Sequence, residues 1–110
     1  MSDTVIISNT TISAIDSVTV LYTASAAGLG TVINAFTATN SSASSVTYKA
    51  YIYDITGSVV SAVIPQTIVV KDRFHAGASI VNQVVPAGGT IRVENSAADG
   101  LNFYASGREQ

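Results

Sequence analysis

Turn-forming residues recur along this chain at short and regular intervals. Clusters of Gly, Asn, Ser, Asp and Pro come about every ten residues, and the runs between them are rich in Val, Ile, Thr, Tyr and Phe. These residue types suit the pleated surface of a sheet, and no segment keeps an apolar stripe at the helical spacing of roughly 3.6 residues. The pattern therefore predicts a chain built of short strands joined by turns.

We predict strands over 4–8 with 10–13, 17–24, 31–39, 46–54, 59–64, 66–71, 78–85, 90–95 and 101–106. Alternation of apolar and polar residues supports these assignments, because successive side chains of a strand point to opposite faces. In TIRVEN, for example, Ile91 and Val93 share one face and Arg92 points to the other. Half-buried antiparallel strands show this period of two residues.

The predicted fold class is all-β, as a single antiparallel β-sandwich or jelly-roll-like domain of about eight strands spanning 1–110. A chain of this length can bury one core. Pro65 lies inside an apolar run. Since proline cannot donate to a sheet ladder, that run is expected to be an edge strand or to be broken there.

Charged residues make up only 11% of the chain, against about 25% in an ordinary soluble domain. A surface so poor in charge suits a protein that packs against copies of itself or a larger assembly. The net charge of −2, without any run of Lys or Arg, argues against a nucleic-acid partner. The lack of cysteine argues against a disulfide framework or a zinc finger.

The beginning of the chain, MSDTVIIS, lacks the basic and apolar regions of a signal peptide. No window approaches the roughly 18 apolar residues that a membrane span requires. We therefore expect no membrane partner, and synthesis in a cytoplasm.

Residues able to perform catalysis or to hold a metal form no recognisable motif. His75 follows Asp72 closely, but along a strand these two side chains would face opposite ways, so we interpret His75 as a loop or interface residue. Asp99 and Gly100 have the pattern of a turn rather than of a calcium loop. We expect no catalytic, metal or cofactor-binding residues and predict that the protein is not an enzyme. A catalytic site shared between subunits stays open as the less favoured alternative.

Tyr51 and Tyr53 share one face of 46–54. In the simpler arrangement, this face packs against a second sheet and Tyr48 points outward. In the other arrangement, the pair is exposed and contacts a partner protein or stacks against sugar rings, since tyrosine combines a large apolar area with a polar tip. The second arrangement makes Tyr51 and Tyr53 candidate interface residues.

The stretch 84–93, VVPAGGTIRV, carries a glycine pair between two apolar runs. A phosphate-binding loop needs a lysine after its glycines or a helix behind them, and here a strand is expected instead. We predict a hairpin turn in which Gly88 and Gly89 adopt positive φ. Arg92 then faces outward, toward Glu94 or a carboxylate of a neighbouring subunit.

Two stretches, 22–40 (YTASAAGLGTVINAFTATN) and 86–109 (PAGGTIRVENSAADGLNFYASGRE), resemble small structural proteins of tailed bacteriophages. In that group, a strand ending in YTA precedes a glycine turn and a strand ending in TN. A Pro/Ala-Gly turn, a strand, a small-residue turn and a closing strand ending in SG come later. The matching positions here are 22–24, 28–30, Asn40, 86–89, Ser106 and Gly107, and the two stretches cover about two fifths of the chain.

The resemblance implies a β-sandwich subunit of the virion without catalytic residues. It favours a capsid decoration or cement protein that stabilises the head through protein–protein contacts, and the alternative is a tail, collar or fibre component that binds a host glycan. We expect a homo-oligomer, with a trimer favoured, that contacts the major capsid protein or another virion protein. It would be made in the host bacterial cytoplasm and reside in the virion. The candidate interface residues are Tyr51, Tyr53, Arg92, Arg108 and Glu109.

Overall fold

The computed structural model describes residues 3–110. This part of the chain forms nine strands and no helix: β1 (Thr4–Thr10), β2 (Thr19–Thr23), β3 (Thr31–Asn40), β4 (Val46–Tyr53), β5 (Val59–Val69), β6 (Phe74–Ala76), β7 (Val84–Val85), β8 (Thr90–Asn95) and β9 (Leu101–Glu109). The all-β class is confirmed. The prediction for 90–95 matches β8 residue for residue, because both ends of this run are marked by turn residues.

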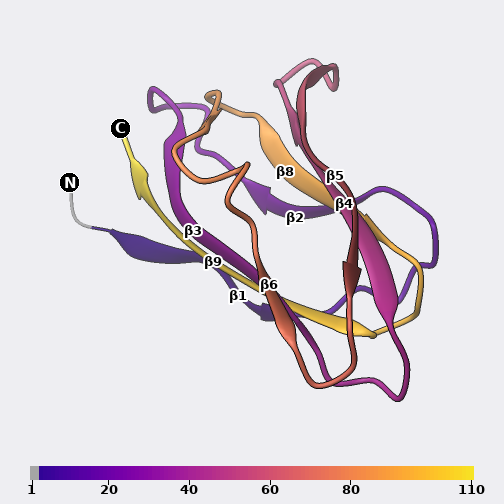
Figure 1. The fold of residues 1–110 in the computed structure, drawn as a ribbon. Coiled ribbons are helices and arrows are strands. Elements are labelled where there is room, and N and C mark those ends of the chain that lie inside the picture. Colours follow the sequence, from indigo (N-terminus) through magenta and orange to yellow (C-terminus); the bar gives the residue numbers. More distant parts are fainter. Residues whose placement is uncertain (1–2) are drawn as a thin grey trace.

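The strands make two antiparallel sheets that stack face to face as a β-sandwich (Figure 1). One sheet has the order β1-β9-β3-β6, with β7 also paired to β3, and the other has the order β2-β8-β4-β5. Within residues 3–110, only β4 and β5 are consecutive strands that pair with each other. The chain therefore crosses repeatedly from one layer to the other, and residues far apart in sequence meet on each sheet.

The core lies between the sheets, where alternate side chains of each strand are buried. Ile91 and Val93 of β8 are completely buried, as their alternation predicted. Three rings meet in the core: the ring centres of Tyr48 and Phe103 are 5.5 Å apart, and those of Phe36 and Phe103 are 6.1 Å apart. Aromatic pairs at such distances contribute about 0.5–1.5 kcal/mol beyond their buried area. These contacts join β3 and β9 of one sheet to β4 of the other.

The two predicted runs around Pro65 form one strand, β5, at an edge of its sheet. The edge position is confirmed, and the predicted alternative of a break is not needed. The β4–β5 register shifts near the proline, where Tyr48 pairs with Thr67 and Ala50 pairs with Ile64. An irregularity of this kind lets an edge strand continue past a residue that has no N–H to donate.

The predicted strand 78–85 is wrong over most of its length. Only Val84 and Val85 form a strand, and the short strand β6 that precedes this region was not predicted. Ile80 is fully buried although it lies in a turn, where its N–H donates to the Gly77 carbonyl at 3.1 Å. Its apolar side chain therefore marks a core contact of a loop and not a strand.

The turn in 84–93 joins strands of different sheets, so the predicted hairpin is wrong. β7 pairs with β3 and β8 pairs with β2 and β4. Gly88 has a positive φ of 72°, as predicted, whereas Gly89 is not among the residues with positive φ. Gly89 is needed for space instead, because a Cβ atom there would lie 2.4 Å from the Tyr53 carbonyl oxygen.

Candidate functional site

The β2-β8-β4-β5 sheet carries a pair of tyrosines on its outer face. Tyr51 and Tyr53 of β4 are half-buried on this face, while Tyr48 points into the core and is 1% exposed. The simpler prediction, with Tyr48 outward, is therefore wrong. Lys49 shares the outer face, and a lysine there keeps its charge in water, which fits this orientation of β4. The ring centres of Tyr51 and Tyr53 are 6.2 Å apart, with their planes at 76°.

Strand β8 brings two charged side chains to the tyrosine pair, since Tyr51 lies opposite Arg92 in the β4–β8 register. The guanidinium carbon of Arg92 lies 4.0 Å from the ring centre of Tyr53. Its Nε donates to Oγ1 of Thr90 at 2.9 Å. Oε1 of Glu94 accepts a hydrogen bond from the Tyr51 hydroxyl at 2.9 Å. Arg92 thus binds an aromatic ring, and Glu94 is held by the other tyrosine.

Each contact in this cluster restrains a side chain on the surface. A cation over an aromatic ring contributes about 0.5–1 kcal/mol at an exposed site. The pKa of Tyr51 is raised above its ordinary value, first by partial burial and then by Glu94, which accepts the phenolic proton and repels a tyrosinate. At neutral pH, Tyr51 is therefore a neutral donor that orients the Glu94 carboxylate.

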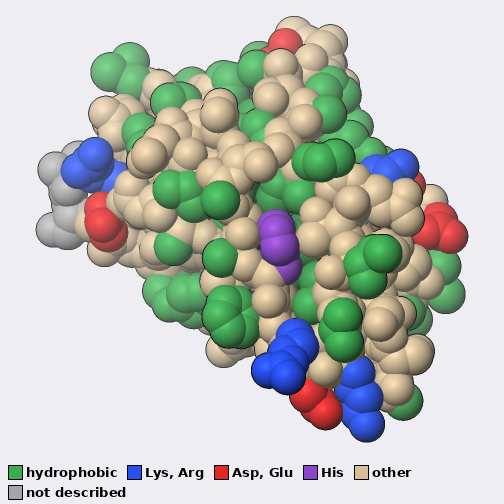
Figure 2. All heavy atoms as spheres, in the orientation of Figure 1, with side chains coloured by type: hydrophobic (Ala, Val, Ile, Leu, Met, Phe, Trp, Pro, Cys, Tyr) green, Lys and Arg blue, Asp and Glu red, His purple; other side chains and the backbone are tan. Residues whose placement is uncertain are grey.

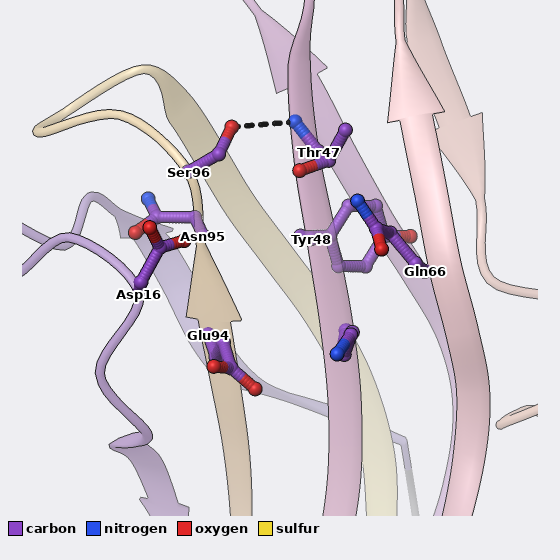
Figure 3. A pocket seen from close by; sticks show the side chains of 8 residues that line it. Asp16, Thr47, Tyr48, Gln66, Glu94, Asn95 and Ser96 are labelled. Carbon is purple, nitrogen blue, oxygen red and sulfur yellow. Dashed lines mark hydrogen bonds between the residues drawn. The ribbon is translucent and has the colours of Figure 1, made fainter.

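A small polar pocket adjoins the tyrosine pair, between β4, β5, β8 and the loop that precedes β2 (Figure 3). Its volume is about 90 Å³, and it is lined by Asp16, Thr47, Tyr48, Lys49, Gln66, Glu94, Asn95 and Ser96. The Thr47 N–H donates to Oγ of Ser96 at 2.9 Å across one end of the pocket. Glu94 lines the pocket and also accepts the hydrogen bond from Tyr51, so the pocket is continuous with the tyrosine pair.

Asn95 lies beside this pocket with its side chain on the core face of the sheet, like that of its register partner Tyr48, and its amide lacks partners. Its side chain is 1% exposed, and among the described residues neither Nδ2 nor Oδ1 has a hydrogen-bond partner. Figure 3 draws Asn95 and Asp16 at the same side of the pocket. The backbone sets this arrangement, because the Asp16 N–H donates to the Asn95 carbonyl at 2.8 Å. Asp16 has a φ of 51°, in the left-handed region that aspartate tolerates.

A second buried asparagine shows how the fold normally treats such a group. Asn40 is fully buried, and its Nδ2 donates to the carbonyls of Val69 at 2.7 Å and Ser44 at 2.9 Å. Its Oδ1 accepts from both the N–H and the hydroxyl of Ser42. Buried polar groups in proteins are satisfied in this way in the large majority of cases. The amide of Asn95 therefore differs from that of Asn40, because it has no hydrogen-bond partner among the described residues.

The single histidine has a structural contact and lies on a strand, not in a loop. His75 belongs to β6, and its Nδ1 lies 2.6 Å from the Tyr48 hydroxyl. Tyr48 comes from the other sheet, so this hydrogen bond crosses the sandwich. The nearby Asp72 lies outside β6 in a turn, where its N–H donates to the Asn40 carbonyl at 2.9 Å.

The remaining predicted interface residues lie elsewhere. Arg108 and Glu109 are exposed at the end of β9, in the β1-β9-β3-β6 sheet, so the fold does not bring them to Tyr51, Tyr53 and Arg92. Among residues 3–110, no group of three His, Cys, Asp or Glu side chains is placed to hold a metal ion. The described part of the chain also has no helix that is long and apolar enough to cross a membrane.

Asn95 and Asp16 were not predicted from the sequence, although a signal for Asn95 was present. In TIRVEN, the alternation that buries Ile91 and Val93 also turns Asn95 inward, and an asparagine at an apolar position is unusual. Asp16 had no comparable signal, because its place depends on the pairing of β2 with β8.

Comparison of the chain with protein-family models, curated proteins and solved structures gave no match.

Proposed function

We propose that this protein is a non-enzymatic structural subunit of a tailed bacteriophage virion, a capsid decoration or cement protein that stabilises the head through protein–protein contacts. It acts as a homo-oligomer and binds the major capsid protein or another virion protein. The resemblance of 22–40 and 86–109 to small phage structural proteins supports its place in the virion. The chemistry of its surface supports its mode of action.

The open edge of β5 carries the proposal. None of the 11 residues of Val59–Val69 is charged, and the strand pairs only with β4. Val59, Val60 and Ile68 are 52%, 54% and 66% exposed. Proteins that remain monomeric commonly protect such an edge with lysines or keep it short, whereas this edge is long and uncharged and is interrupted only by Pro65 and by irregular pairing with β4. An uncharged apolar edge strand is suited to contact with another chain.

The rest of the surface supports assembly as well. At the opposite edge of the same sheet, Val18 just before β2 and Val20 within β2 are 41% and 46% exposed, and β2 has no charged residue either. On the face drawn in Figure 2, charged side chains lie at the rim, and the centre is apolar or neutral apart from the histidine. Monomeric proteins rarely leave apolar patches of more than a few hundred Å² uncovered. Sandwiches packed side by side would cover both edges.

Such a subunit would stabilise the capsid through the surface area that it buries against neighbouring proteins. A specific interface buries about 1,200–2,000 Å² in total. Its apolar part contributes roughly 25 cal/mol per Å², against which the loss of translational and rotational freedom must be set. A subunit that spans the joint between capsid proteins favours the assembled shell by mass action, since it binds that state and not the separated one.

The mass of the native protein tests the self-association. We expect an oligomer by light scattering or native mass spectrometry. The double variant Val60→Lys, Ile68→Lys should shift the mass to that of a monomer, because two charges would be buried at the β5 edge. Leu29→Lys is the matched control, since Leu29 is 83% exposed in a turn away from β5. A wild-type protein that stays monomeric at every concentration would contradict self-association through β5.

Addition of the purified protein to expanded capsids that lack it tests the role on the virion. We expect it to bind and to raise the temperature at which the capsids break, and the β5 double variant should lose this effect. Protein that neither sediments with capsids nor changes their melting temperature would show that the cement function is wrong.

A further inference from the structure

We propose that the outer face of the β1-β9-β3-β6 sheet binds a second copy of this chain, and that Phe74 of each copy enters an apolar groove of the other. The groove lies along β3, between the positions at which β6 and β7 pair with it. This inference rests on the proposed self-association. It adds the residues that hold two copies together and the symmetry of their contact.

Phe74 is an exposed aromatic residue at the start of β6. The next residue, His75, points inward, since its Nδ1 lies 2.6 Å from the hydroxyl of the buried Tyr48. Successive side chains of a strand alternate, so Phe74 and Ala76 point outward. Phe74 is 68% exposed, whereas the other two phenylalanines of the chain are buried in the core. Contact with an apolar surface would remove this ring from water.

An apolar groove opens on the same face as this ring. Its volume is about 330 Å³, and of the described residues that line it none is charged. Its walls are formed by Ala35, Thr37, Ala76, Ala78 and Val81. A dry apolar cavity of about 150 Å³ takes up a benzene molecule, so this groove has room for the ring of a phenylalanine.

The short separation of the ring and the groove determines the symmetry of the contact. Phe74 and Ala76 are two residues apart on one strand, which places the ring about 7 Å from the wall of the groove. When the same patch of two copies meets across a two-fold axis, each copy gives and receives the same contact. An axis near His75 therefore seats both rings at once. The expected unit is a dimer, in place of the trimer favoured from the sequence, because a ring of three copies needs the two halves of the contact on different sides of the domain.

The charges of this face also allow it to meet itself. Across β3, Phe74 pairs with Thr39 and Ala76 pairs with Thr37, and none of these four residues is charged. A two-fold axis brings identical residues close together, so charged side chains here would repel each other. An uncharged face that carries both a ring and a groove is complementary to a second copy of itself.

The groove adjoins the edge that the proposed function uses. β5 and β6 are edge strands of different sheets, and they lie on the same side of the sandwich. A Cβ atom at Gly77, which follows β6, would lie 3.1 Å from Cδ1 of Ile64 in β5. One neighbouring copy can therefore cover both, and the face of β6 extends the contact toward the roughly 1,200–2,000 Å² of a specific interface.

The native mass of two single variants tests this contact. Phe74→Ala removes the ring, and Ala76→Arg places a long charged side chain in the wall of the groove. Each should raise the dissociation constant of the dimer by about a hundredfold or more, because two ring contacts are lost at once. Both positions are exposed, so the monomers should fold. Leu29→Ala, which removes an exposed apolar side chain from a turn outside the groove, is the control and should remain dimeric.

A mixture of the two variants separates a direct contact from a general loss of stability. In a mixed dimer, the ring kept by the Ala76→Arg copy meets the open groove of the Phe74→Ala copy. One of the two contacts is restored, so native mass spectrometry should show this mixed dimer at concentrations at which each variant alone is monomeric. A mixture that stays monomeric would overturn the proposal.

The remaining outcomes distinguish this contact from the proposed function. If Phe74→Ala kept the wild-type mass while the β5 double variant became monomeric, only the contact proposed here would be wrong. A wild-type monomer would contradict both proposals, and a wild-type trimer would contradict the two-fold contact. If Phe74→Ala lost capsid binding without a change of mass, the groove would bind a segment of the capsid protein, and the second copy would be the wrong occupant.

Discussion

The Tyr48 hydroxyl lies 2.6 Å from Nδ1 of His75, and this hydrogen bond joins the two sheets of the sandwich. Tyr48 is on β4 and His75 is on β6, which belong to different sheets. Removal of the hydroxyl by Tyr48→Phe should lower the free energy of unfolding by about 1–2 kcal/mol, because the ring contacts with Phe36 and Phe103 remain and only the hydrogen bond is lost. Denaturant titration measures this change.

Tyr104→Phe is the control for that comparison, since Tyr104 is 38% exposed on β9 and its change should leave the midpoint nearly unaltered. Combination of Tyr48→Phe with His75→Ala should be less damaging than the sum of the two single changes. Strictly additive effects would contradict a direct bond between the two side chains.

Stability should fall in alkaline solution because of the same tyrosine. Burial raises the pKa of Tyr48 well above its ordinary value of 10.0. The unfolded chain releases this proton near that pH and the folded protein keeps it, so the contribution is complete below pH 10.0 and is lost progressively above it. The slope should reach up to about 1.4 kcal/mol per pH unit.

Denaturant midpoints measured across this pH range check the expectation. In Tyr48→Phe, the slope above pH 10.0 should become much shallower. A small residual slope is expected from Tyr51, whose pKa is also raised by partial burial and by Glu94. An unchanged alkaline slope in the phenylalanine variant would assign the loss of stability to other groups.

The two buried asparagines should respond in opposite directions to replacement by leucine, which has nearly the same shape. Asn95→Leu should raise the free energy of unfolding by about 1 kcal/mol, because it removes a buried amide without partners. Asn40→Leu should lower it by about 3 kcal/mol or more, because it breaks bonds to Ser42, Ser44 and Val69.

Thermal and denaturant melts of the two variants measure the expected increase in stability for Asn95→Leu and the expected decrease for Asn40→Leu. If Asn95→Leu were as damaging as Asn40→Leu, the Asn95 amide would have a role in folding.

Two glycines should differ sharply in their tolerance of a methyl group. Gly89→Ala should lower the free energy of unfolding by about 2–3 kcal/mol, because the new Cβ would lie 2.4 Å from the Tyr53 carbonyl oxygen. Gly57→Ala should cost about 1 kcal/mol, since Gly57 has a φ of 84° but open space around it.

Melting temperatures of the purified alanine variants measure this difference. The Gly89 variant should also disturb the amide resonance of Tyr53, whereas the Gly57 variant should disturb only its own turn. Equal melting temperatures would mean that the backbone near Tyr53 can move to make room.

Local patterns account for what could be predicted of the strands. Alternation in 46–54 and 90–95 identified β4 and β8, because the period of two residues is a property of a single strand. The same reasoning failed over 78–85, where Ile80 is buried from a turn. A run of apolar residues reports burial, and burial alone does not require a strand.

The candidate site was only partly predictable. Tyr51 and Tyr53 were identified because of their residue type and their shared face of one strand, and Arg92 because of its charge and its outward alternation. Their contacts were not, since the position of the Arg92 guanidinium over Tyr53 depends on the register between β4 and β8. Arg108 and Glu109 were grouped with them by chemistry, but the topology places them on the other sheet.

The sequence by itself determined the all-β class, most strand positions and the alternation within each strand, because these follow from the conformation of a few neighbouring residues. The tertiary structure decided which face of β4 turns inward and which strands pair, because those choices depend on packing between distant segments. Tyr48 and Tyr51 are chemically alike, and only the fit against Phe36 and Phe103 buries the first. Asp16 and Asn95 meet only because their segments are joined across the sheet.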